Sequence, residues 1–214
     1  MIIDTHCHAG ENWFLPIESL EFEMNQAGVD AAVLIQHGGT YDNNYLFREA
    51  SKRRGRFKVV VMIDPDDSDP LGSMEKLWEQ GAAGIRIAPD GKFSHISNVI
   101  EIWHKAGELG LVVSSLGNDD KFSSASFKNI IDTCPDTQIV IEHLAGVGMN
   151  EPPYNAYKSA LECAQRPNTT IKIPGLGEIT PRPTTLRPEF GFETVPPLFE
   201  MAYEAFGPDR MMWG

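Results

Sequence analysis

Short runs rich in β-branched and other apolar residues recur along the chain at a nearly constant interval. Their starts are separated by 29, 26, 27, 27, 26, 32 and 41 residues, and the stretches between them have helical character. Such an alternation predicts a parallel sheet covered by helices. Several runs are apolar at nearly every position, which is typical of strands buried on both faces. The runs span residues 2–8, 31–36, 57–64, 84–88, 111–116, 137–144, 169–174 and 210–214.

The stretches between the runs place their apolar residues at helical spacing. Residues 96–106 carry them at i, i+3, i+4, i+7 and i+10, before a glycine at position 110 that is expected to end the helix. Residues 195–206 repeat this pattern. Asp69 followed by Pro70 predicts a capped helix start. We interpret all of these stripes as faces that pack on the core.

Eight strands with this period predict a (β/α)8 TIM barrel, a fold that typically takes about 250 residues. An open doubly wound sheet is the alternative, but the first run is followed by AGENWF rather than by a GxGxxG turn for a dinucleotide. We therefore expect one barrel domain over residues 1–214. The eighth run is also the last part of the chain, so we expect a barrel that is truncated after strand eight and lacks its eighth helix.

Composition narrows the partners of this domain. The 214 residues include 18 Lys and Arg against 30 Asp and Glu, a net charge of −12, which argues against the basic surface that nucleic acid requires. No apolar run approaches the roughly 20 residues of a membrane span, and no signal peptide is visible. Cys7, Cys134 and Cys163 form no disulfide or CxxC pattern. We expect a cytoplasmic protein with a small-molecule substrate; a homo-oligomer is left open.

The first run carries the residues with the clearest chemistry. Asp4, His6 and His8 alternate along a strand, so their side chains share one face, while Cys7 faces the helical layer as a small core residue. In a barrel the shared face points inward, and His8 lies at the carboxyl end of the strand, where barrel active sites are built. Two imidazoles there can bind one cation, and Asp4 can orient a ligand. A buried, hydrogen-bonded histidine pair is the alternative.

Other polar residues sit at the ends of later runs. Arg86 lies between two small residues and can bind a substrate carboxylate through paired hydrogen bonds, although a structural ion pair is an equal alternative. Lys172 is a weaker case of the same kind. Gln36 and His37 end the second run and are expected to contact substrate, with a solvated loop position as the alternative for His37.

Two connections are candidates for substrate contact. Residues 174–194 are long for a loop after a strand and rich in proline, which indicates a lid or binding element on the catalytic face. Arg182 and Arg187 within it can meet an anionic substrate; a loop that only covers the barrel mouth is the alternative. Trp13 and Phe14, after the first run, can form an apolar wall.

Several segments, taken in order, resemble the amidohydrolase superfamily and its amidohydrolase-related (amidohydrolase 2) branch, which includes sugar-lactone hydrolases. The resemblance covers essentially the whole chain, and the HxH motif together with EHLAG and FGPDRMMWG makes it specific. The matching segments are HxH in the first run, VLIQHGGTYDNNYL, GAAGIRIAPDG, QIVIEHLAG, RPNTTIKIPGLGE and FGPDRMMWG.

The resemblance implies roles for further residues. His143, in EHLAG, is expected to be a metal ligand or a proton-transfer group, whereas a structural histidine is the alternative. Glu142 is expected to face away from His143 by strand alternation, so we assign it no role. Ser115 stands where many members carry a strand-five histidine, and it joins the expected substrate-binding residues. The family pattern continues with Gly-Ser-Asp after strand eight, and Gly214 precedes the position of that Asp.

These features predict a metal-dependent hydrolase that opens a lactone or another ester-like carbonyl of a small anionic or sugar-derived substrate. His6, His8 and His143 are the expected ligands of one divalent ion, zinc by preference, with manganese or another metal as alternatives. His143 and Arg86 are the expected catalytic residues. A non-oxidative decarboxylase of the same branch and a non-catalytic binding barrel are the alternative functions.

Overall fold

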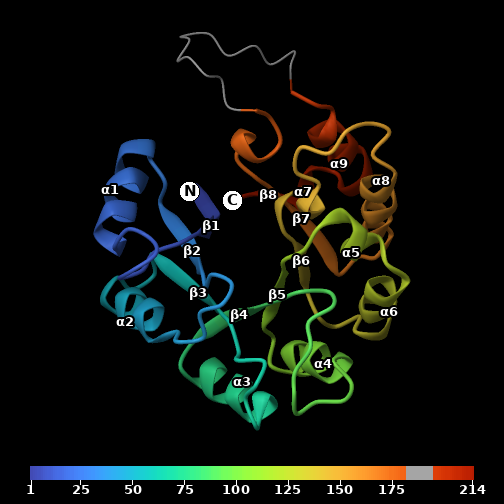
Figure 1. Ribbon diagram of the computed structural model, residues 1–214. Coiled ribbons are helices and arrows are strands. Elements are labelled where there is room, and N and C mark those ends of the chain that lie inside the picture. The colour runs from blue at the N-terminus through green and yellow to red at the C-terminus, as the bar shows by residue number, and fades with distance from the viewer. Residues whose placement is uncertain (182–194) are drawn as a thin grey trace.

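The computed structural model describes residues 1–181 and 195–214. Within these residues eight parallel strands follow one another around a barrel in the order of the sequence, and helices surround them (Figure 1). The predicted (β/α)8 TIM barrel is therefore confirmed. The strands are β1 (Ile3–Cys7), β2 (Ala31–Ile35), β3 (Phe57–Val61), β4 (Ala82–Ile87), β5 (Val112–Ser115), β6 (Ile139–Ile141), β7 (Thr169–Ile173) and β8 (Met211–Trp213).

Helices in the described part of the chain follow the strands and form the outer layer of Figure 1. No helix among these residues is both long and apolar enough to cross a membrane. The α-helices are α1 (Ile17–Ala27), α2 (Asn44–Lys52), α3 (Pro70–Glu79), α4 (Ile100–Glu108), α5 (Asp119–Ser123), α6 (Ala125–Thr133), α7 (His143–Gly146), α8 (Asn155–Leu161) and α9 (Leu198–Phe206), with short 3₁₀ segments η1 (Glu162–Gln165), η2 (Leu176–Glu178) and η4 (Pro208–Arg210).

Local sequence explains where two of these helices begin and end. In α3 the Asp69 carboxylate accepts a hydrogen bond from the Gly72 N–H (3.0 Å) and Pro70 occupies the first turn, as predicted. Helix α4 starts at Ile100, later than the stripe beginning at residue 96 suggested. Gly110 follows its end with a φ of 67°, a left-handed conformation that glycine adopts without steric cost.

The barrel is nearly closed between its first and last strands. Hydrogen-bonded ladders connect each strand to the next from β1 to β8, and β8 packs beside β1. Between these two strands the Thr5 hydroxyl donates to the Trp213 carbonyl oxygen (2.6 Å).

The apolar core lies between the barrel and its helices, and Cys7 is buried there as predicted. Its largest fully buried side chains are Trp103, Tyr157, Phe122 and Phe127. The inside of the barrel has a different character, because Ser114, Glu142 and Lys172 are all buried polar residues there. Buried polar groups must be hydrogen-bonded to be tolerated, so these contacts determine the candidate site.

Candidate active site

A buried carboxylate lies at the centre of the site. Glu142 directly follows β6, and its side chain is 1% exposed. Arg86 on β4 donates from Nε to Oε1 (3.0 Å) and from Nη2 to Oε2 (2.7 Å), while the Ser114 hydroxyl on β5 donates to Oε1 (2.7 Å). Burial alone would raise the pKa of Glu142, but the hydrogen bonds and charge of Arg86 outweigh it and lower the pKa. The carboxylate is therefore ionised and fixed.

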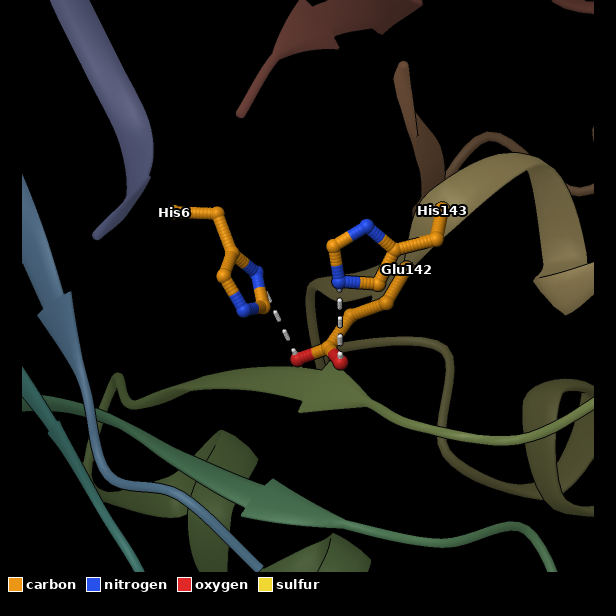
Figure 2. A group of neighbouring side chains, drawn as sticks. All are labelled: His6, Glu142 and His143. Carbon is orange, nitrogen blue, oxygen red and sulfur yellow. Dashed lines mark ion pairs between the residues drawn. The ribbon is translucent and has the colours of Figure 1, made fainter. Parts of the chain in front are cut away.

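The expected orientation of Glu142 is wrong. Its Oε2 lies 3.9 Å from Nε2 of His143, so both side chains point into the barrel (Figure 2). The pairing of strands explains Glu142: Ser114 is in register with Val140, and alternation carries the inward face from Val140 to Glu142. Alternation would then turn His143 outward, and a change of backbone conformation prevents this.

A left-handed turn brings His143 inward. Glu142 is extended (φ −74°, ψ 146°), whereas His143, Leu144 and Ala145 have φ values of 51°, 50° and 56°. Each such residue costs roughly 1–2 kcal/mol relative to the right-handed conformation. Consecutive residues can face the same interior only because extended geometry ends at Glu142. Strain of this kind is concentrated at functional sites.

Close packing supports this turn. Gly146 continues it with a φ of 60°, and a Cβ at this position would lie 2.0 Å from the Gly117 carbonyl oxygen and 2.9 Å from Asn118 Cα. Only a residue without a side chain permits this approach. The backbone of the β5–α5 connection thus braces the turn that aims His143.

His6 and His8 meet at the same end of the barrel, as the spacing predicted. Nδ1–H of His8 donates to the Ile35 carbonyl oxygen (2.7 Å), which leaves the lone pair of His8 on Nε2. That atom lies 3.3 Å from Nε2 of His6. Burial lowers the pKa of His8 to about 4 and lowers the pKa of His6 further. Both rings are neutral at physiological pH, the form that binds metals.

His143 completes a group that can hold a cation. One ligand atom each from His6, Glu142 and His143 lies within 4.8 Å of the other two, and Figure 2 shows both rings beside the carboxylate. Nδ1 of His143 is buried, and within the described residues it has no hydrogen-bond partner; Oε1 of Glu178 is 3.5 Å away. Burial lowers the pKa of His143 as well. A buried nitrogen without a partner is costly unless a ligand uses the ring.

Lys172 lies beside this group rather than on the surface. Its ammonium donates to the Thr5 carbonyl oxygen (2.8 Å) and lies 3.2 Å from Nδ1 of His6 and 3.4 Å from the Ser114 hydroxyl. Burial lowers the pKa of Lys172 to about 8. Lys172 therefore lies on the Nδ1 side of His6, whose Nε2 faces His8.

Two predicted residues have different surroundings from those expected. Arg86 is committed to Glu142 and donates from Nη1 to the Gln36 carbonyl oxygen (3.1 Å), which is the structural ion pair considered as the alternative. Ser115 is fully buried and donates to the Ile87 carbonyl oxygen (3.0 Å), away from the cluster. The inward hydroxyl of β5 is that of Ser114, because Ser114 is in register with Arg86.

The remaining predicted residues surround the cluster or lie outside the described part. The Gln36 amide donates to the Asp42 carbonyl oxygen (2.8 Å) and shapes the loop after β2. His37, in that loop, lines a pocket beside His8. Asp4 accepts from the His6 backbone N–H (2.9 Å) and so orients the strand rather than a ring. Arg182 and Arg187 lie outside the described residues.

The fold and the site together define an enzyme of the amidohydrolase type: a parallel barrel with imidazoles and a carboxylate gathered at the carboxyl ends of its strands. A family model described as amidohydrolase matches residues 3–214, and the chain belongs to this family. No curated protein matches the chain.

Solved structures share the fold at low identity. A putative 2-pyrone-4,6-dicarboxylic acid hydrolase from Pseudomonas putida is 18% identical with a TM-score of 0.76, over 99% of this chain and 81% of that one. An amidohydrolase from Burkholderia multivorans with bound zinc is 18% identical with a TM-score of 0.78, over 100% and 83%. A probable 2-pyrone-4,6-dicarboxylic acid hydrolase from Acinetobacter baumannii with bound citric acid is 16% identical with a TM-score of 0.71, over 100% and 82%.

The backbone contact that supports the turn at His143 can be tested with two glycines that have similar φ values, Gly146 and Gly148. Gly146→Ala is expected to lower the free energy of unfolding by about 3 kcal/mol, because its methyl group meets the Gly117 backbone. Gly148→Ala is the control: its φ is 57°, but nothing lies closer than 4.0 Å, so only about 1 kcal/mol is expected. Urea denaturation measures both, and equal losses would contradict the brace.

The buried ion pair has its own test. Arg86→Met is expected to lower the free energy of unfolding by about 3 kcal/mol, because Glu142 is left buried without its main partner. Adding Glu142→Met to this variant should restore most of the loss. Chemical denaturation of the single and double variants measures the difference. A double variant no more stable than Arg86→Met alone would show that the pair is not the cause.

Proposed function

We propose that the chain is a metal-dependent hydrolase that opens a lactone or another ester-like carbonyl of a small anionic or sugar-derived substrate. The observation that carries the proposal is the 3.3 Å separation of the His6 and His8 Nε2 atoms. Two nitrogens about 2.0–2.1 Å from one tetrahedral zinc lie about 3.3 Å apart, so these atoms already have the spacing of two ligands. His143, with its unpartnered buried nitrogen, supplies a third imidazole.

The donor set fits a divalent cation. His6, His8 and His143 are the proposed ligands, and imidazole suits zinc, copper, iron and nickel. The described residues whose ligand atoms all lie within 4.8 Å of one another are His6, Glu142 and His143, so His8 joins this group only through its contact with His6. These residues would hold a divalent ion, which when bound would supply polarisation of a substrate carbonyl and a water with its pKa lowered toward about 7. The zinc bound to the related barrel from Burkholderia multivorans supports zinc as the first metal to test.

The chain's own residues hold and orient this set. The Ile35 carbonyl oxygen fixes the His8 tautomer with its lone pair on Nε2. Binding through Nε2 of His6 would place the proton of that ring on Nδ1, 3.2 Å from Nζ of Lys172. Glu142 lies 3.9 Å from both His6 and His143, where its negative charge favours a cation or a protonated imidazole. Proton transfer is the alternative role of His143 to metal binding, because Oε1 of Glu178 lies 3.5 Å from its Nδ1 and Oε2 of Glu142 lies 3.9 Å from its Nε2.

Substrate would enter over the carboxyl ends of the strands. His37 lines a pocket there, and Lys172 is the cation nearest to the imidazoles. Arg86 acts as a positioning residue in this proposal, because its guanidinium orients Glu142. We keep Arg182 as a proposed contact for an anionic group of the substrate, and Gln36 as a residue that shapes the entrance.

Metal uptake tests the ligand set directly. The double variant His6→Ala/His8→Ala is expected to retain no stoichiometric zinc after dialysis, because both facing nitrogens are lost. Elemental analysis by mass spectrometry measures the bound metal. His104→Ala, an exposed histidine on α4, is the matched control and should leave zinc binding unchanged. Stoichiometric zinc in the double variant would refute the site.

The reaction is tested with a panel of lactones. With zinc or manganese present, the protein is expected to hydrolyse D-glucono-1,5-lactone or 3,4-dihydrocoumarin faster than the spontaneous rate, measured by acid release. His143→Asn should lower kcat/KM by about 10²-fold or more if His143 transfers the proton. Absence of hydrolysis across the panel would contradict the proposal. Carbon dioxide release from aromatic acids would favour a decarboxylase instead, and neither activity would favour a binding barrel.

A further inference from the structure

A pocket of about 340 Å³ adjoins the imidazole cluster, within the range of small-molecule sites. The loops after β1 and β2 form it, and its walls include Trp13, Phe14 and His37. Phe14 stacks on the His8 ring with centroids 4.5 Å apart and planes at 22°, so the pocket shares a wall with the proposed ligand set. A molecule in this pocket would lie beside the atoms that the proposed reaction uses.

The pocket has the shape of an aromatic slot. Trp13 and His37 face each other at 27° with centroids 6.4 Å apart, toward the long end of aromatic contact distances. Phe14 closes one side by meeting His37 edge-on at 5.3 Å. Trp13 is 80% exposed, a large apolar surface that a ligand would cover. A flat ring can stack on the exposed face of Trp13 beside these rings.

The charged residues that line the pocket indicate which charge a bound ring can carry. Two carboxylates, those of Glu11 and Asp42, line it, and no Lys or Arg of the described residues does. Glu11 is paired with Arg48 (2.5 Å), whereas Asp42 accepts one hydrogen bond from the Asn44 backbone N–H (2.9 Å) and keeps its negative charge. An anionic ring would therefore meet like charge from Asp42, with no Lys or Arg among the described lining residues to pair with it.

We propose that this pocket binds a planar ring without negative charge and thereby admits aromatic or fused-ring lactones, which extends the candidate substrates beyond anionic and sugar-derived ones. The link between this pocket and catalysis rests on the proposed function. Binding of the ring does not depend on that function. Trp13 is the specificity-determining residue, because it forms the exposed face of the slot.

Equilibrium binding of rings that cannot be hydrolysed tests the pocket. The neutral probe is 3,4-dihydro-2(1H)-quinolinone, the lactam counterpart of dihydrocoumarin; quinoline-2-carboxylate is the anionic probe and N-methylquinolinium the cationic one. Isothermal titration calorimetry is expected to give the neutral and cationic probes at least about tenfold tighter binding than quinoline-2-carboxylate. Trp13→Ala should weaken the neutral probe about five- to tenfold, the loss of one stacking contact. Trp78→Ala, half-exposed on α3, should leave it unchanged.

The outcomes separate this inference from the proposed function. Binding of the neutral probe without hydrolysis of any lactone would support the pocket and contradict the hydrolase. Hydrolysis of lactones together with equal or tighter binding of the anionic ring would support the hydrolase and contradict the pocket. An unchanged affinity in Trp13→Ala would also overturn the inference. If dihydrocoumarin is hydrolysed, Trp13→Ala should raise KM and leave kcat nearly unchanged, because the residue contacts the ring and not the reacting carbonyl.

Discussion

The buried pair of Arg86 and Glu142 is the interaction on which the interior of this barrel depends. A carboxylate that is 1% exposed is tolerated only with a charged, hydrogen-bonded partner, and Arg86 supplies two donors from β4, two strands away from β6. Once ionised, Glu142 determines what can surround it. Ser114 hydrogen-bonds to it, and His6 and His143 lie 3.9 Å from its two oxygens. Residues from β1, β4, β5 and the end of β6 are thus organised by a single negative charge.

The second constraint is conformational. A strand cannot direct neighbouring residues to one side, and the site needs both Glu142 and His143 inside the barrel. The left-handed turn from His143 meets this need at a cost of roughly 1–2 kcal/mol for each non-glycine residue. Contact between Gly146 and the Gly117 backbone keeps the turn in place. Stability of the neighbouring β5–α5 connection therefore offsets the strain that positions His143.

Much of the fold could be predicted from the sequence because burial on both faces of a parallel strand leaves a plain apolar run. The run 31–36 corresponds to β2 at Ala31–Ile35, and 210–214 to β8 at Met211–Trp213. His6 and His8 were predictable for a similar reason, since a period of two fixes their shared face. The position of Glu142 was not predictable in this way. Alternation of side chains along a strand holds only for extended backbone, and the backbone is no longer extended at His143. Ser114 rather than Ser115 faces inward for a reason that only strand register reveals.

Charge divides the mouth of the barrel into two regions, and this division orients whatever binds there. Arg86 and Lys172 outnumber Glu142 on the axis, so the imidazole cluster favours the electron-rich end of a ligand. The aromatic pocket beside His8 carries Glu11 and Asp42 and disfavours negative charge. A cyclic ester has this polarity, with a carbonyl oxygen at one end and an apolar ring at the other. Its carbonyl would therefore point toward His6 and His8 while its ring lies against Phe14, because the reverse orientation would leave the carbonyl dipole facing two carboxylates.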